Sequence, residues 1–349
     1  MTLENQIIRL LRDNILMRVQ STYGVGITDD FKSLIDRLQG LYSNIDLAQY
    51  SSVVAFLGHT EMGSGTKIKE ENVCHHSRKT LVVNFLDEEG YVEIIIKKVN
   101  VISLSNNYLV YQWTQRDHLA DKFVLKGDVV PYCQDPCSNG FSYFARKTYK
   151  SLEDAIIYYR DNMALDAKGK ALNDALRHNR LFFKNAPESL LQEALCEYLI
   201  SSLRDQATVK REETVDESHP VDLRITFKST NHMALIEIKW LGRSINESET
   251  GFTAIHDVKR AKDGAKQLVD YIDSNTESFP SNTTAGYLVV YDLRRKKNTN
   301  PSNTKLLRKD ADFYRFKELD LKPDYKKVRS DYKGTYRLFI KVSKNAYQD

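Results

Sequence analysis

Two acidic residues and a lysine are the strongest candidates for chemistry in this chain. Asp222 opens one run of β-forming residues, Val221–Phe227, and Glu237 and Lys239 lie near the end of the next run, Met233–Leu241. Side chains alternate along an extended strand, so Glu237 and Lys239 should point to the same face. Carboxylates are suitable ligands for Mg²⁺ or Mn²⁺, and a neighbouring lysine can orient a water and stabilise charge on a phosphate.

A short polar link should bring the three residues together. The segment 228–232 has the length of a hairpin connection and would place Asp222 beside Glu237 and Lys239 at one edge of a sheet. An acid followed at a distance by Glu-x-Lys also occurs by chance in lysine-rich chains. The alternative interpretation of these residues is therefore a solvated strand end.

This segment resembles the PD-(D/E)xK superfamily, the restriction-endonuclease-like nucleases. The matching residues are Asp222 and Glu237-x-Lys239, although the chain has Pro220-Val-Asp222 where the motif has Pro-Asp. The resemblance implies that the two acids and the backbone carbonyl of Ile238 hold the metal, and that Lys239 positions or activates the attacking water. It covers about residues 185–295, under a third of the chain.

The helix expected over Glu188–Leu203 extends this resemblance. It carries Glu193 and Glu197 one turn apart, and many members of the superfamily place a helix glutamate near the metal from this position. We expect Glu193 to have that role, with Glu197 as the alternative. Either residue could instead be an ordinary surface carboxylate.

A second helix, expected over about Ile255–Asp273, contains Gln267-x-x-x-Tyr271, and residues four apart share a helical face. A Q-x-x-x-Y helix resembles the subgroup that includes the nuclease domains of recombination helicases and CRISPR-adaptation exonucleases. There the pair helps to bind DNA or to arrange the site. The alternative is an amphipathic helix with Tyr271 in the core.

Positive charge is concentrated in the same part of the chain. The overall net charge is only +4. Residues 251–349 contain 21 Lys/Arg and 13 Asp/Glu, a net of +8, whereas the first 250 residues have a net of −4. Cations near the suspected site would neutralise phosphates without reading sequence. The candidates for nucleic-acid binding are Lys259, Arg260, Lys262, Lys266, Arg294 and Arg295.

Length and hydrophobic patterning indicate a two-domain α/β protein. At 349 residues, about two domains are expected. Residues 184–349 predict a restriction-endonuclease-like mixed sheet flanked by helices. Residues 1–183 predict a separate α+β N-terminal domain for target recognition, sensing or oligomerisation, beginning with a helix at 4–20. Four cysteines are too few for a disulfide scaffold, and no apolar run is long enough to cross a membrane, so we expect a cytoplasmic protein.

The sequence therefore predicts a metal-dependent nuclease that hydrolyses phosphodiesters, with Mg²⁺ or Mn²⁺ as cofactor and DNA as substrate. By analogy, such a nuclease with an added N-terminal domain would act in a prokaryotic restriction or anti-phage system. Two alternatives remain open. One is a non-catalytic nucleic-acid-binding or assembly subunit that keeps the nuclease fold, and the other is a junction- or RNA-directed nuclease. The intact Asp222, Glu237 and Lys239 argue against the first alternative.

Overall fold

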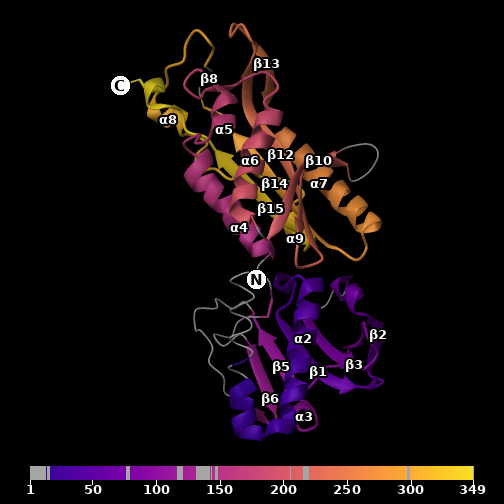
Figure 1. Cartoon of the computed structure of the whole chain (residues 1–349). Helices are drawn as coiled ribbons and strands as arrows, with labels where there is room; N and C mark the ends of the chain where they lie inside the picture. The colour runs from indigo at the N-terminus through magenta and orange to yellow at the C-terminus, as the bar shows by residue number, and fades with distance from the viewer. Residues whose placement is uncertain are drawn as a thin grey trace. The chain divides into compact units, whose positions relative to one another are not determined.

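The computed structural model describes residues 13, 16–75, 79–115, 121–130, 142, 144–145, 148–204, 206–214, 220–296 and 299–348. The chain divides into two compact units, Met1–Arg146 and Lys147–Asp349 (Figure 1). Each unit contains a mixed sheet and helices, which confirms the mixed α/β class. Residues 16–23 are helical, as expected for the N-terminal helix, whereas most of its first half lies outside the described residues.

The first unit contains a seven-stranded sheet in the order β2-β4-β3-β1-β5-β6-β7. The strands are β1 Ser52–His59, β2 Gly65–Lys69, β3 Thr80–Leu86, β4 Tyr91–Ile95, β5 Val110–Thr114, β6 Asp121–Leu125 and β7 Asp128–Val129. Strands β1 and β3 are parallel, and the other pairs are antiparallel. Helix α2 (Thr28–Asn44) buries Phe31, Leu34, Ile35 and Leu38 against this sheet, and α3 (Val101–Ser105) is capped by the side chain of Asn100.

The second unit is built on a sheet in the order β10-β11-β12-β14-β15. Its strands are β8 Leu176–Arg177, β9 Phe182–Phe183, β10 Ala207–Thr214, β11 Pro220–Phe227, β12 His232–Ile245, β13 Phe252–His256, β14 Thr283–Asp292 and β15 Tyr332–Phe339. Its helices are α4 Thr148–Tyr158, a π-helix at Tyr159–Ala164, α5 Lys170–Asp174, α6 Glu188–Leu203, α7 Val258–Ser278, α8 Arg308–Ala311 and α9 Tyr325–Val328. Strands β10, β11 and β12 are antiparallel neighbours, whereas β12, β14 and β15 run parallel.

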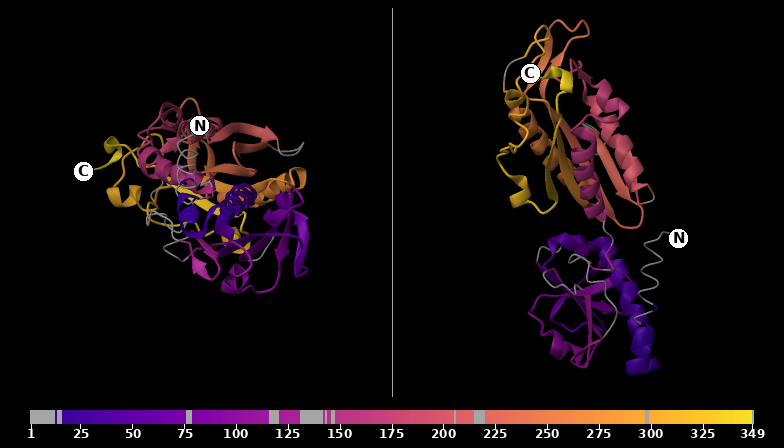
Figure 2. Two further views of the ribbon diagram at one scale, coloured as in Figure 1. Left: turned by 60° about the horizontal axis from the view of Figure 1, so that its bottom comes forward. Right: turned by 90° about the vertical axis from the view of Figure 1, so that its left-hand side faces the viewer.

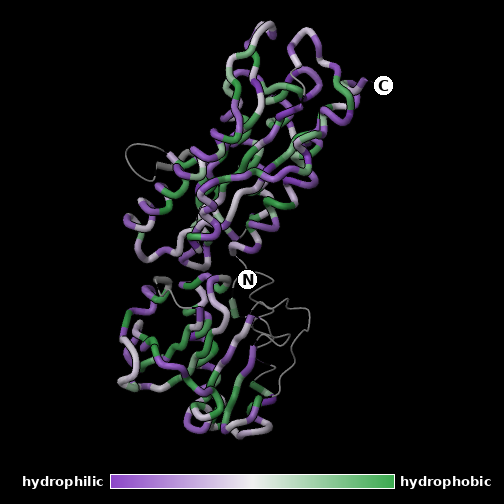
Figure 3. Tube along the Cα trace, turned by 180° about the vertical axis from the view of Figure 1, so that it is seen from behind, coloured by the Kyte–Doolittle hydropathy of each residue, from purple (hydrophilic) through white to green (hydrophobic). Residues whose placement is uncertain are grey.

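Helices cover both faces of this second sheet (Figures 1 and 2). Side-chain alternation along β12 assigns its residues to two cores. Ala234, Ile236, Ile238 and Trp240 pack with residues of α4 and α6, whereas Met233, Leu235 and Leu241 pack with α7. Figure 3 shows the hydrophobic segments of both units running mainly along the strands, with hydrophilic residues frequent in the outer turns. Glu237 and Lys239 therefore belong to the α7 face, as the alternation predicts.

The contacts place residues 148–183 in the second unit, not in the N-terminal part where we expected them. Tyr149, Leu152, Ile156 and Leu172 are buried in the same core as α6 and the sheet. The apolar spacing of residues 152–181 favours a helical stretch with a possible break at 162–170, and the structure does divide it there, into α4 with the π-helix and α5. The chain leaves the helical conformation after Asp174 and forms the β8–β9 hairpin, whose turn residues 178–180 all have positive φ. Propensity favoured a helix there, but the hairpin is stabilised by pairing with β12 through Ser244 and Phe183.

The helix expected from about Ile255 begins at Val258 instead. The side chain of Asp257 accepts a hydrogen bond from the Lys259 backbone N–H, which caps the helix at its first turn. The residues before this cap form β13, which pairs with the end of β12. Helix α6 has the bounds that the apolar periodicity predicts.

Candidate active site

Asp222 lies where β11 and β12 diverge. The ladder between these strands runs from Thr226 paired with Met233 to Leu223 paired with Ile236, where the pairing among the described residues ends. The next residue on β11 is Asp222, whose Oδ2 accepts a hydrogen bond from the Ile238 backbone N–H at 2.6 Å. Its Oδ1 accepts a hydrogen bond from Gln192 Nε2 of α6, also at 2.6 Å. The fork between the strands thus places a carboxylate beside Glu237-x-Lys239.

Glu237 and Lys239 are adjacent on the α7 face of β12. Glu237 is 1% exposed, and its Oε1 accepts a hydrogen bond from Lys239 Nζ. The same ammonium group donates to Gln267 Oε1 of α7 at 3.1 Å. Helix α7 can approach this closely because residue 264 is glycine, since a Cβ there would lie 2.6 Å from Lys239 Cγ. Lys239 is therefore held between Glu237 and α7.

The Gln267-x-x-x-Tyr271 pair continues this hydrogen-bond chain. Gln267 Nε2 donates to the Tyr271 hydroxyl at 2.6 Å, and that hydroxyl donates to the Pro220 carbonyl at 3.3 Å. Pro220 stands two residues before Asp222 on β11. The structure thus brings the helix pair to the acids and the lysine, and it connects α7 to both strands of the fork. Tyr271 is buried, so it also contributes to the core.

Burial and like charge act on Glu237 together. Burial and, after it, the nearby negative charge of Asp222 raise the pKa of Glu237, which stands at about 8 instead of 4.5. The charges of Lys239 and Arg260 act in the opposite direction and are outweighed. Two carboxylates that are close and desolvated share their site most stably with a proton or a cation between them. The electrostatics therefore favour uptake of a positive charge.

Two buried oxygen atoms at this site lack a hydrogen-bond partner in the part of the chain that the structure describes. They are Glu237 Oε2 and Gln192 Oε1. A buried acceptor without a partner is costly, so its presence calls for an explanation such as a bound ion. Carboxylate and amide oxygens are the hard ligands that Mg²⁺ and Mn²⁺ prefer. Glu237, Asp222 and Gln192 thus have donor types that fit such a cation.

The acidic residues at the fork that could bind a metal ion are Asp222 and Glu237. Within the described ranges, no group of three or more His, Cys, Asp or Glu residues could hold a metal ion. A cation at the fork would therefore be held by two carboxylates and neutral oxygens. Ile238 lies at the fork, where its backbone N–H donates to Asp222.

The helix carboxylate expected at the site is replaced by an amide. Glu193 faces Arg211 of β10, with 3.8 Å between Oε2 and NH1, and Glu197 is exposed. Neither residue is brought to Asp222. Gln192 is the residue that reaches it, because one step along a helix turns the side chain by about 100°. The sequence contained a signal that we missed: Gln192 is polar but shares the apolar face of α6 with Leu195 and Leu199.

The basic residues divide into two groups. Lys259, Lys262 and Lys266 are exposed on α7, so their charges are available to a ligand. Arg260 is half-buried, and its charge lowers the pKa of Glu237, which places it near the fork. Helix α7 therefore carries three exposed lysines and one half-buried arginine.

Arg294 and Arg295 are instead engaged within the fold. Arg294 forms a two-point ion pair with buried Asp292, with Nε–Oδ1 at 3.0 Å and NH2–Oδ2 at 2.7 Å. Arg295 donates to the carbonyls of Arg294 and Ile340 at 3.1 and 2.6 Å. Their expected role in nucleic-acid binding therefore competes with a structural one.

Comparisons with known proteins add no relative to these observations. No family model, no curated protein and no solved structure matches this chain. Among the residues that the structure describes, no helix is both long enough and apolar enough to span a membrane.

Proposed function

We propose that this chain is a metal-dependent nuclease of the PD-(D/E)xK type that hydrolyses phosphodiester bonds in DNA. The proposal rests on one observation above all: the oxygen atoms at the β11–β12 fork. Glu237 Oε2 and Gln192 Oε1 are buried without a hydrogen-bond partner among the described residues. The other polar atom of each group is engaged: Gln192 Nε2 donates to Asp222, and Glu237 Oε1 accepts from Lys239. A purely structural polar cluster would be expected to satisfy these acceptors.

Each residue has a defined role in this proposal. A divalent cation, Mg²⁺ or Mn²⁺, would activate a water and neutralise charge that develops on the phosphate. Asp222 and Glu237 would hold it, with the Gln192 amide oxygen and the Ile238 carbonyl as neutral ligands. Once Glu237 is engaged with the cation, Lys239 can donate toward the water or the phosphate. Gln267 keeps the Lys239 ammonium in place by accepting its second hydrogen bond.

The same assignment implies which residues contact the DNA and what the first unit does. The exposed lysines of α7, Lys259, Lys262 and Lys266, would contact the DNA backbone near the cleaved bond. The first unit would recognise a target or bind a partner or a second copy of the chain. In this proposal the protein is a prokaryotic restriction or anti-phage nuclease that acts in the cytoplasm.

The test is cleavage of linear, nicked and supercoiled DNA, and of RNA, with Mg²⁺ or with EDTA. We expect Mg²⁺-dependent cleavage of DNA that falls by about 100-fold or more in Lys239→Ala, because the variant lacks the positioned charge. Gln192→Ala and Glu193→Ala form a matched pair on adjacent residues of α6. The first should weaken Mg²⁺-dependent cleavage, and the second should leave it near the wild-type level.

Two results would contradict the proposal. One is cleavage that is equal in the wild type and in Lys239→Ala on every substrate. The other is cleavage that persists unchanged in EDTA, because the assigned ligands would then have no role. If Glu193→Ala lowers Mg²⁺-dependent cleavage more than Gln192→Ala does, the metal ligand on α6 is Glu193 and not Gln192.

A further inference from the structure

An exposed aromatic residue stands on a turn at the edge of the second sheet. Phe316 is 83% exposed, although a large apolar side chain is normally covered. It is flanked in sequence by two cations, and the Arg315 guanidinium lies 5.0 Å from the centre of its ring. The turn itself is short, with the Lys317 N–H donating to the Tyr314 carbonyl at 3.1 Å. Arg315 and Phe316 therefore lie together on the turn, and the exposed Lys317 follows with its ammonium group 3.4 Å from the centre of the Phe313 ring.

This turn is held rigidly by a buried ion pair. The Arg337 guanidinium of β15 donates to the backbone carbonyls of Tyr314, Arg315 and Lys317. Its Nε donates to Oδ2 of Asp292 at 2.6 Å, and Asp292 is fully buried. An arginine anchored in this way holds the turn against the sheet. The exposure of Phe316 is thus built into the fold and does not result from a loose loop.

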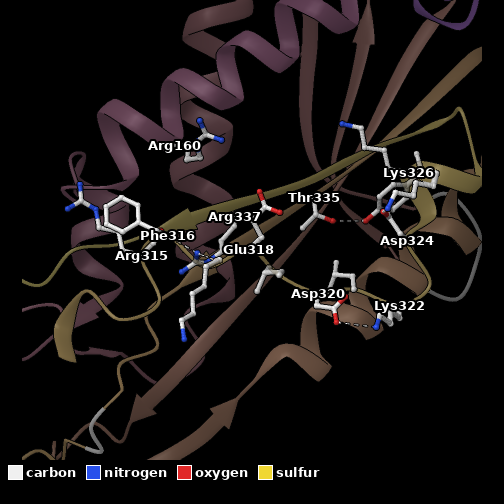
Figure 4. Close-up of a pocket in the computed structure, with 15 residues that line it drawn as sticks. Arg160, Arg315, Phe316, Glu318, Asp320, Lys322, Asp324, Lys326, Thr335 and Arg337 are labelled. Atoms are coloured by element: carbon white, nitrogen blue, oxygen red, sulfur yellow. Dashed lines mark hydrogen bonds and ion pairs between the residues drawn. The ribbon is translucent and has the colours of Figure 1, made fainter. Parts of the chain in front are cut away.

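The turn forms one wall of a groove along the edge strand β15. The groove has a volume of about 710 Å³, and its lining includes seven Lys or Arg residues and three Asp or Glu residues. Figure 4 shows Arg315 and Phe316 at one end of it and Lys326 and Asp324 at the other. Among the described residues, Arg315, Lys317 and Lys326 have no acidic partner within 4.0 Å. The groove is therefore cationic, with charges available to a ligand.

Strand register relates this groove to the candidate active site. In the two parallel ladders, Glu237 aligns with Leu288 and then Thr335, and Lys239 aligns with Val290 and then Arg337. Thr335 and Arg337, which line the groove, thus lie level with the site and on the same sheet face, two strands away. At about 4.8 Å per strand this is a separation of about 10 Å across the sheet.

We propose that this groove binds single-stranded nucleic acid, with phosphates on Arg315, Lys317 and Lys326 and an unpaired base stacked on Phe316. The inference deepens the proposed nuclease function, on which it rests, by naming a second contact with the same substrate. Aromatic rings interleaved with cations are the usual means of binding a strand without regard to sequence. Charges on an edge strand also prevent aggregation, but that role does not require an exposed phenylalanine.

The test is binding by the full-length chain in EDTA, measured as fluorescence anisotropy of a labelled single strand and of an abasic strand of equal length. We expect Phe316→Ala to bind the ordinary strand about tenfold more weakly and the abasic strand as the wild type does. Ile102→Ala is the matched control, since Ile102 is also exposed but lies in the first unit. It should bind both strands normally.

The charges are tested by salt dependence. Arg315→Gln combined with Lys317→Gln should lower the slope of log affinity against log salt by about 1.4, because each phosphate that is no longer neutralised lowers it by about 0.7. Lys97→Gln combined with Lys98→Gln removes the same charge from exposed residues of the first unit and should leave the slope unchanged.

The inference fails if the wild type does not bind the strand, or if Phe316→Ala binds it as tightly as the wild type does. It also fails if Phe316→Ala weakens binding to both strands equally, because the ring would then not stack on bases. Cleavage by wild type and Lys239→Ala, measured in parallel, reports separately on the proposed function. Weaker strand binding by Phe316→Ala, without any Mg²⁺-dependent cleavage by the wild type, would overturn the nuclease assignment while supporting the groove.

Discussion

Replacing buried Asp292, at the end of β14, should show how much the thermal stability of the second unit depends on one carboxylate. Asp292 is fully buried and pairs with two arginines, Arg294 and Arg337. Burial by itself would raise the pKa of Asp292, but the hydrogen bonds and charges of these arginines lower it below the ordinary value. The carboxylate is therefore ionised in the folded chain. Asp292→Asn removes its charge and leaves both guanidinium groups poorly solvated.

The size of the effect follows from this burial. The side chains of Arg294 and Arg337 are only 14% and 12% exposed, so neither can recover full hydration when its partner is removed. Breaking a buried ion pair by removing one partner costs about 3–5 kcal/mol. For a unit of about 200 residues, each kcal/mol lowers Tm by about 2–4 °C. We therefore expect Tm of the second unit to fall by about 10 °C.

Asp273 provides a matched control within the same unit. It forms a two-point ion pair with Arg329, at 3.1 and 2.6 Å, but its side chain is 55% exposed. Exposed pairs contribute about 0.2–1 kcal/mol, so Asp273→Asn should lower Tm by only a few degrees. Both variants are compared by calorimetry and denaturant unfolding at pH 7. If Asp292→Asn costs no more than Asp273→Asn, burial does not determine the strength of these pairs and the reasoning is wrong.

Two further predictions concern the site itself. In EDTA, the pKa of Glu237 of about 8 means that the folded chain keeps a proton which the unfolded chain releases near 4.5. The free energy of unfolding should therefore fall between pH 5 and 8, by up to about 1.4 kcal/mol per pH unit. Glu237→Gln should flatten this dependence in denaturant titrations, and equal slopes would refute the raised pKa. Gly264→Ala should lower both Tm and cleavage, since its Cβ would displace Lys239, whereas helix propensity alone predicts stabilisation by about 1 kcal/mol. Higher Tm with unchanged cleavage would show that Lys239 can move without loss of function.

Local patterning was sufficient to predict the strands and helices that carry the candidate site. Alternation predicted β11 and β12 and placed Glu237 and Lys239 on one face, and apolar periodicity predicted α6 with its observed bounds. These features depend on how side-chain direction repeats along a helix or strand and on which residues are apolar. Both can be read from residues that are close in the sequence. The proximity of Asp222 followed from the short hairpin link.

Tertiary structure decided which side chains complete the site. The choice between Gln192 and Glu193 depends on the rotation of α6 over the sheet, which a count of acidic residues cannot predict. The engagement of Arg294 with Asp292 is likewise a long-range effect, because the carboxylate is buried only when β15 and Arg337 pack beside it. For the same reason the sequence could not show that Arg294 and Arg295 are engaged within the fold.

Residues 148–183 and Phe316 are two further features that depend on tertiary contacts and not on local sequence. Helical propensity in the first segment yielded to the β8–β9 hairpin because pairing with β12 outweighs local preference. Phe316 had no distinguishing pattern in the sequence, and its exposure results from Arg337, 21 residues later, holding its turn against the sheet. The sequence alone determined α6, strands β11 and β12 and the acid–acid–lysine triplet, since these depend on neighbouring residues. Only the tertiary structure determined which polar atoms were left without partners, because that depends on residues distant in the chain.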